Sequence, residues 1–256
     1  MRACDVLRVF TRDGSGGNHL GVIRDLTGLT GSRMQSIASD LGFSETVFLG
    51  RAEDGVPTAR IFTPASELPF AGHPLVGAAW TLFRDSQEAP DRIRCGVGDV
   101  AIGGDGDMTW IEPPFDQEVA SPAIDVSDWV EEVHGSTVLM PLPYLVVQTD
   151  AVERVARLSA PPWDHSVYVW AWDQRDELVR ARFFAGEHGV TEDPATGSAA
   201  VALAASLRAR GTGFADLVIH QGEEMGHPSR IHLAWEGSRV RVAGTVAHDE
   251  TRVLEV

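Results

Sequence analysis

Two short segments of the sequence place polar side chains just before runs of small apolar residues. His73 stands in "PFAGHPLVGAA" and Asp193 stands in "EDPATGSAA". An imidazole and a carboxyl group can each exchange a proton near neutral pH when their surroundings shift their pKa values. A third candidate, Glu45, lies in "SETVFL" at the first position of an expected strand. These three side chains could perform general acid–base chemistry on a small molecule.

The residues that follow His73 and Asp193 predict two buried helices. "GHPLVGAAWTLFRD" is apolar nearly all round with a proline in its first turn, and "ATGSAAVALAASLRAR" is alanine-rich, opened by Pro194 and stopped by Gly211. Helix N-termini present unpaired N–H groups and a partial positive charge, so two of them facing one cleft would receive a small carboxylate. The structural alternative is that Asp193 and His73 only cap their helices, which is a common role for aspartate.

The two segments resemble each other closely enough to indicate a duplication. Placing His73 on Asp193 aligns Pro74 with Pro194, and also matches the glycine and alanine residues that follow, at an offset of 120 in a chain of 256 residues. The strand sequence "PTARIFTP" is echoed by "VRARFFAG" in the second half. We therefore expect two pseudosymmetric halves.

Each half reads as strands wrapped around one central helix, which predicts an α+β fold made of two barrel-like sheets. The proline cluster in "IEPPFDQEVASP" sets the expected boundary, with residues 1–113 in the first half and 114–256 in the second. A surface helix is expected in "LTGSRMQSIASDLGF", with Ser32 able to cap it and Gly42 at its end. Read back from the strand match, the counterpart of Glu45 falls near Ser166, so an acid at this position would be single.

Composition narrows the class of function. The net charge of −16 argues against a nucleic-acid partner, because such binding depends on clustered basic residues. Cys4 and Cys95 lie in apolar strand-like segments, which suggests buried thiols in a reducing compartment. We find no signal peptide and no apolar run that could cross a bilayer, so we expect a cytoplasmic protein without a membrane partner. The other histidines lack ligand spacing, so no metal is expected.

Five motifs in order, "GGNHLGVI", "SETVFL", "FAGHPLVGAA", "EDPATGSAA" and "QGEEMGHPS", resemble the phenazine-biosynthesis PhzF family, whose fold is similar to that of diaminopimelate epimerase. The resemblance implies an isomerase without cofactor, often a homodimer, with its active site between the two halves. It implies that Glu45 moves a proton between substrate carbons, while His73 and Asp193 orient the substrate.

The same resemblance implies further substrate-binding residues. Ser198 lies with the catalytic residues, backbone groups around Gly72 and Gly197 can donate to the substrate carboxylate, and Asn18 belongs to the first motif. In the related epimerases two cysteines occupy the helix entries, whereas those positions hold glycine with His73, and an aspartate, here. Two-thiol racemisation is therefore disfavoured.

The sequence departs from the family pattern at two places. The usual Asn-Pro of the first motif is Asn18-His19 here, and the usual Gly-Arg-Pro-Ser is Gly226-His227-Pro228-Ser229. If both changes border the cleft, they bear on the identity of the substrate.

The resemblance favours proton migration in a small, cyclic, unsaturated carboxylic acid, in secondary-metabolite biosynthesis. One alternative is an amino-acid racemase or epimerase, and another is a non-catalytic protein that binds a small molecule on the same fold. A serine hydrolase built on Ser198 is a weaker alternative, because "ATGSAA" lacks the glycine two residues before the serine that a nucleophile elbow requires.

Overall fold

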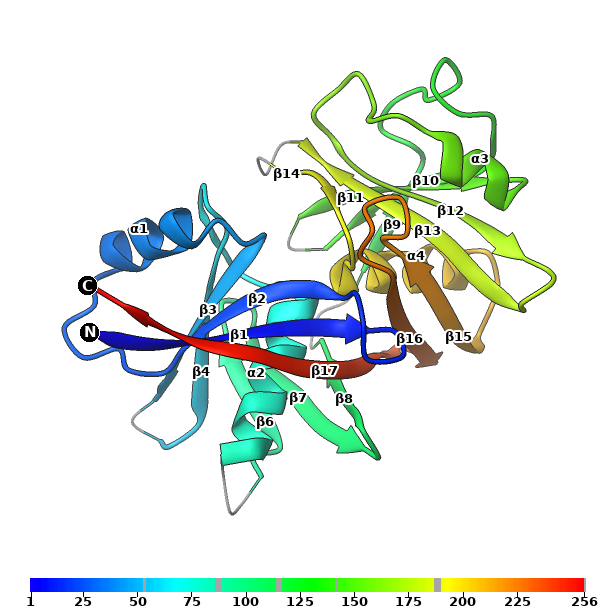
Figure 1. Cartoon of the computed structure of the whole chain (residues 1–256). Coiled ribbons are helices and arrows are strands. Elements are labelled where there is room, and N and C mark those ends of the chain that lie inside the picture. Colours follow the sequence, from blue (N-terminus) through cyan, green and yellow to red (C-terminus); the bar gives the residue numbers. More distant parts are fainter. Residues whose placement is uncertain (53, 86–88, 114–116, 141, 187–189, 256) are drawn as a thin grey trace.

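Strands dominate the structure, and two of its helices are enclosed by them (Figure 1). The computed structural model describes residues 1–256 apart from 53, 86–88, 114–116, 141, 187–189 and 256. The elements up to residue 112 are β1 (Arg2–Thr11), β2 (Asn18–Ile23), α1 (Gly31–Leu41), β3 (Glu45–Arg51), β4 (Pro57–Phe62), β5 (Glu67–Leu68), α2 (Gly72–Asp85), β6 (Arg92–Cys95), β7 (Gly98–Asp105) and β8 (Met108–Glu112).

The later elements follow nearly the same order along the chain. They are β9 (Glu118–Ala120), β10 (Glu132–Leu139), β11 (Pro143–Thr149), α3 (Val152–Arg157), β12 (Ser166–Asp173), β13 (Leu178–Ala185), β14 (Val190–Asp193), α4 (Gly197–Ala209), β15 (Phe214–Gln221), β16 (Ser229–Glu236) and β17 (Arg239–Leu254).

The first half is a closed ring of strands around α2. Pairing runs from β1 through β2, β3, β4, β6, β7 and β8 to β17, which returns to β1. The helix is apolar because the ring encloses it, and its residues from Gly72 to Ala79 are all buried. Gly77 lies so close to the wall that an added Cβ would come within 2.4 Å of Leu20. The size of this residue is therefore fixed by packing.

The second half repeats this arrangement around α4. Each half contains two parallel strand pairs at matching places. In the first half they are β2 with β3 and β4 with β6, and in the second half β11 with β12 and β13 with β15. The helix α4 is buried from Gly197 to Ser206 and packs against β9, β10, β11, β16 and β17. The expected α+β fold with two barrel-like, pseudosymmetric halves is confirmed.

Strand register identifies the corresponding positions in the two halves. Thr46 pairs with Phe62 and Val167 pairs with Phe184, so the residue before each, Glu45 and Ser166, occupy equivalent places. This agrees with the counterpart expected from the sequence.

The offset of 120 that aligned the two helix motifs is wrong by five residues. Ile61 pairs with Leu68 as Phe183 pairs with Asp193, and the helices begin four residues later in both halves, at Gly72 and Gly197. The structural counterpart of Asp193 is therefore Leu68, and that of His73 is Ser198. The motif alignment failed because proline is compatible both with the first turn of a helix and with the segment just before it.

The helix starts differ from expectation at two caps. Thr30, rather than Ser32, is the N-cap of α1, because α1 begins at Gly31 and the Thr30 hydroxyl accepts a hydrogen bond from the Arg33 N–H. The helix α4 begins at Gly197 with Thr196 at its cap, after Pro194 instead of at it. Gly42 ends α1 in the left-handed conformation, with φ of 68°, as expected.

One strand belongs to both halves. The start of β17 pairs with β16, its middle with β8, and its remainder, up to Leu254, with β1. In Figure 1 this strand runs from the second half into the first, where the two chain termini lie side by side. By its pairing, the last part of the chain completes the first ring, and the boundary at residue 113 remains a prediction for the rest of the chain.

Candidate active site

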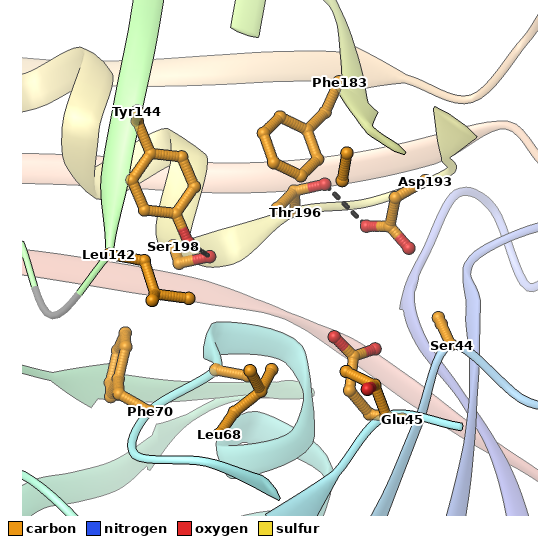
Figure 2. Close-up of a pocket in the computed structure, with 13 residues that line it drawn as sticks. Ser44, Glu45, Leu68, Phe70, Leu142, Tyr144, Phe183, Asp193, Thr196 and Ser198 are labelled. Atoms are coloured by element: carbon orange, nitrogen blue, oxygen red, sulfur yellow. Dashed lines mark hydrogen bonds between the residues drawn. The ribbon is translucent and has the colours of Figure 1, made fainter. Parts of the chain in front are cut away.

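A cavity lies between the two halves, where the strands of each half and the starts of α2 and α4 meet. The space between its lining residues that is not filled by atoms amounts to about 460 Å³, counting the part that is open to solvent. The residues that line it are Ser44, Glu45, Thr63, Leu68, Phe70, Ala71, Leu142, Tyr144, Phe183, Ala185, Asp193, Thr196 and Ser198. Figure 2 draws these residues as sticks, with Glu45 on one side of the cavity and Tyr144 and Ser198 on the other.

Glu45 is the first residue of β3, and its carboxyl group points into the cavity. Its Oε2 atom lies 3.5 Å from Nε2 of His73, a residue of the first turn of α2. Within the described part of the chain, both atoms are buried and neither has a hydrogen-bond partner. Buried polar atoms are seldom left unpaired, and Glu45 lines the cavity, so its free oxygen is available to a ligand, whereas His73 lies behind Glu45 and is not among the described lining residues.

Burial sets the protonation states of these two side chains. Loss of solvation, and secondly the charge of Asp193, raise the pKa of Glu45 to about 8. Loss of solvation lowers the pKa of His73 to about 3. At neutral pH His73 is therefore uncharged, and Glu45 can gain or lose a proton at small cost.

Asp193 is held rigidly at the end of β14. Its two carboxylate oxygens accept hydrogen bonds from the Asn18 amide at 2.8 Å and from the Thr196 hydroxyl at 2.5 Å, and its backbone carbonyl accepts one from Gln221 at 2.8 Å. Burial raises the pKa of Asp193 to about 6, although the hydrogen bonds from Thr196 and Asn18 oppose the shift. Asp193 is thus fixed in place, whereas Glu45 keeps an unpaired oxygen.

Asn18 connects the candidate residues from behind the cavity wall. Its amide nitrogen lies 2.8 Å from Asp193 and 3.3 Å from Nδ1 of His73, and its carbonyl oxygen accepts from the Ser44 hydroxyl at 2.8 Å. The side chain is 2% exposed and does not line the cavity. Asn18, which the resemblance assigns to substrate binding, thus holds Asp193, His73 and Ser44 in position from outside the described cavity lining.

The two helix starts face each other closely at the cavity. An added Cβ on Gly72 would lie 2.7 Å from both Cα of Gly197 and the backbone nitrogen of Ser198. Only glycine permits this approach, which brings the free N–H groups of both first turns together. The Ser198 hydroxyl beside them accepts a hydrogen bond from Tyr144 at 2.9 Å.

No sequence pattern predicted the apolar part of the cavity. Leu68, Phe70, Leu142, Tyr144 and Phe183 come from distant segments and meet only in the folded chain. Only Phe70 stands in one of the motifs, "FAGHPLVGAA", and none carries a group that would draw attention as reactive, except the hydroxyl of Tyr144; apolar residues of this kind are ordinarily core residues. Among the described residues that line the cavity, none is an arginine, and the sequence contains no lysine.

The two departures from the family pattern lie together, away from the cavity lining. The rings of His19 and His227 meet edge to face with centroids 5.6 Å apart, and His19 also stacks on Phe43 at 5.9 Å. Burial lowers the pKa of His19. Neither histidine is among the described residues that line the cavity, so the expectation that they border it is not met there.

The cysteines lie outside the described cavity lining. Burial raises the pKa of the Cys4 thiol to about 11 and also raises that of Cys95, so neither sulfur is poised as a thiolate. In the described part of the chain, no group of three or more potential ligands is arranged to hold a metal ion. The same part contains no helix long and apolar enough to cross a membrane.

The chain matches known proteins over nearly its whole length. The model of the phenazine biosynthesis-like protein family matches residues 7–251. A trans-2,3-dihydro-3-hydroxyanthranilate isomerase from Pseudomonas aeruginosa is 33% identical over 93% of this chain and 92% of its own, and one from Pseudomonas chlororaphis is 32% identical over 89% and 90%.

Solved structures give the same result for the fold. A "Predicted Epimerase" from Pseudomonas aeruginosa superposes with a TM-score of 0.82 at 28% identity, over the full length of both chains. A PhzF family protein from Bacillus anthracis superposes with a TM-score of 0.83 at 22% identity, over 99% of both chains. The family match, these relatives and the enclosed helix pair agree that the chain belongs to the phenazine-biosynthesis PhzF family of isomerases.

Proposed function

We propose that this protein moves a proton between two carbon atoms of a small, cyclic, unsaturated carboxylic acid, with Glu45 as the general acid and base. The observation that supports the proposal most strongly is the Glu45 carboxyl group, which is buried at the cavity with an unpaired oxygen 3.5 Å from neutral His73. A carboxylate removes a carbon-bound proton effectively only when burial has raised its pKa toward the working pH, and the pKa of Glu45 is raised to about 8.

The proposed reaction begins with ionised Glu45. It takes a proton from one carbon next to the unsaturated system, and the electron pair left behind spreads through the conjugated bonds to the substrate carboxylate. Protonated Glu45 then returns the proton to another carbon of the same system. The double bond has moved, the composition is unchanged, and no oxidant or reductant is consumed.

The charge that develops on the carboxylate needs stabilisation without a basic side chain in the described lining. The opposed first turns of α2 and α4, which meet at Gly72 and Gly197, provide N–H groups for this purpose. His73, Asp193 and Ser198 orient the substrate around them in this proposal. Such fixed donors stabilise the transition state, in which additional negative charge reaches the carboxylate, more than they stabilise the bound substrate.

The experiment uses trans-2,3-dihydro-3-hydroxyanthranilate, the compound in the name of the relatives. We expect its ultraviolet spectrum to change in the presence of the protein, and deuterium to enter a carbon position in deuterated water. Glu45→Gln should abolish both changes while the compound still binds. A wild-type protein that binds the compound without either change would contradict the proposal and favour the binding-protein alternative.

The racemase alternative is distinguished by the same experiment with amino acids, because inversion changes optical rotation without moving a double bond. Two features count against it. A pyridoxal phosphate racemase would need a lysine, which the sequence lacks. A second base on the opposite face is missing at the equivalent position, which holds Ser166 instead of an acid. A role in secondary metabolism is part of our proposal and follows from the resemblance alone.

A further inference from the structure

Tyr144 reaches the cavity from the half of the molecule that does not carry Glu45. It is the second residue of β11, its side chain is 7% exposed, and its ring forms part of the cavity wall (Figure 2). Its hydroxyl donates a hydrogen bond of 2.9 Å to Oγ of Ser198, the second residue of α4. A tyrosine hydroxyl buried on a polar partner acts on that partner as well as filling space.

The direction of this hydrogen bond decides what Ser198 can do. A serine hydroxyl has one proton to donate and two lone pairs to accept with. Because Tyr144 donates to one lone pair, the proton of Ser198 is directed elsewhere, and within the described residues Ser198 donates to no protein acceptor. Ser198 is 6% exposed and lines the cavity, so its proton is available to a ligand bound there.

The surroundings of Ser198 select the kind of ligand. Its hydroxyl lies at the facing first turns of α2 and α4, where the backbone offers only N–H donors. On the side of the cavity that carries Glu45, the Nε2 atom of His73, which is 3% exposed, has no partner among the described residues. A serine fixed as a donor among other donors suits an acceptor with several lone pairs, and a carboxylate is such an acceptor.

We infer that Tyr144 is a positioning residue, which fixes the Ser198 hydroxyl as a donor to the substrate carboxylate. This inference rests on the proposed function, since it needs a substrate with a carboxylate at the helix starts. Without the Tyr144 hydroxyl, Ser198 can turn its proton back toward the vacated position or toward a backbone carbonyl of its helix, and its bond to the substrate weakens.

The test measures binding of 3-hydroxyanthranilate, a stable aromatic acid, and of its carboxamide by isothermal titration calorimetry. Tyr144→Phe keeps the ring and removes only the hydroxyl, so we expect a loss of acid affinity of about threefold to tenfold, the value of one hydrogen bond. The carboxamide should lose less. In a Ser198→Ala background, Tyr144→Phe should have no further effect, because the bond it controls is already absent.

Tyr168→Phe is the matched control. Tyr168 is fully buried in the same half, and its hydroxyl has no hydrogen-bond partner among the described residues. This variant should bind like the wild type, and thermal unfolding should show that all variants are folded. Equal binding by Tyr144→Phe and wild type, or additive losses with Ser198→Ala, would overturn the inference alone. Failure of the wild type to bind the acid would overturn the proposed substrate class and the inference with it.

Discussion

The two halves share a framework and differ in what they place on it. At the first residue of the equivalent strands β3 and β12 stand Glu45 and Ser166. Just before the enclosed helices, Leu68 in one half corresponds to Asp193 in the other. At the second residue of each helix, His73 corresponds to Ser198.

The differences at these three places are complementary. The first half supplies the group that can move a proton together with its neutral imidazole neighbour, while the second half supplies a fixed carboxylate and a hydroxyl. The feature kept in both halves is the glycine at the helix start, which lets the first turns of the two helices approach each other closely beside the cavity. In our proposal, duplication provides the pair of helix starts that receives the substrate carboxylate, and divergence at the other positions makes the chemistry one-sided.

The largest difference between the two halves is expected when the first residue of β3 or of β12 is replaced. Glu45→Gln should lower kcat by about 10²–10⁴-fold, the usual contribution of a general acid–base group. Ser166→Ala changes the equivalent place in the other half and should leave kcat close to that of the wild type. Steady-state kinetics with trans-2,3-dihydro-3-hydroxyanthranilate compares the two. A large effect of Ser166→Ala would mean that both halves take part in proton transfer.

The next prediction concerns the feature the halves share. Gly72→Ala puts a Cβ 2.7 Å from the backbone of Gly197, whereas Gly197→Ala puts one 3.2 Å from Gly72 and from the edge of the Phe10 ring. Backbone atoms cannot move aside as a ring can, so Gly72→Ala should cost about 1–3 kcal/mol of unfolding free energy and Gly197→Ala less. Urea denaturation of the two variants measures the difference. Equal costs would show that the contact between the helix starts is looser than described.

The last prediction concerns how the stability of the protein depends on pH. The pKa of Glu45 is raised from its ordinary value of 4.5 to about 8, so between these pH values the folded protein holds a proton that the unfolded chain releases. The resulting stabilisation is complete below pH 4.5 and is lost as the pH rises through 8. Glu45→Gln should therefore resemble the wild type in Tm at pH 5 and exceed it at pH 9.

Calorimetry at the two pH values checks this prediction, with Ser166→Ala as the control that should show no such pH dependence. An equal difference in Tm between Glu45→Gln and wild type at both pH values would mean that Glu45 titrates normally and is solvated.

The same raised pKa of Glu45 predicts that turnover increases as the pH approaches 8, because only ionised Glu45 can take the first proton.

The sequence predicted the framework better than the pairing of its parts. The apolar helices and the strand match were enough to place Glu45 opposite Ser166, because strand register conserves spacing within each half. The helix motifs were misaligned, because glycine, proline and alanine recur near any helix start and do not mark one position. Only the register of β14 against β13 shows that Leu68, and not His73, is the counterpart of Asp193.

Other parts of the site could not be derived from sequence patterns. Asn18 was placed with the substrate, yet its amide lies behind the wall and joins Asp193 to His73, a role that only side-chain direction reveals. Tyr144 and Leu142 carry no motif and reach the cavity through the fold of the second half. Long-range contacts of this kind depend on tertiary packing, about which local spacing contains no information.

The shared strand β17 has a mechanical consequence. Because its ladder continues from β16 to β1 without interruption of the strand, the two halves are joined by backbone hydrogen bonds as well as by the chain itself. A rotation that widened the cavity would have to bend this strand near Gly244, where an added Cβ would already lie 2.4 Å from Phe10. Widening the cavity in this way would therefore also distort β17 at a crowded position. The stiffness of this strand limits how far the two halves can move apart.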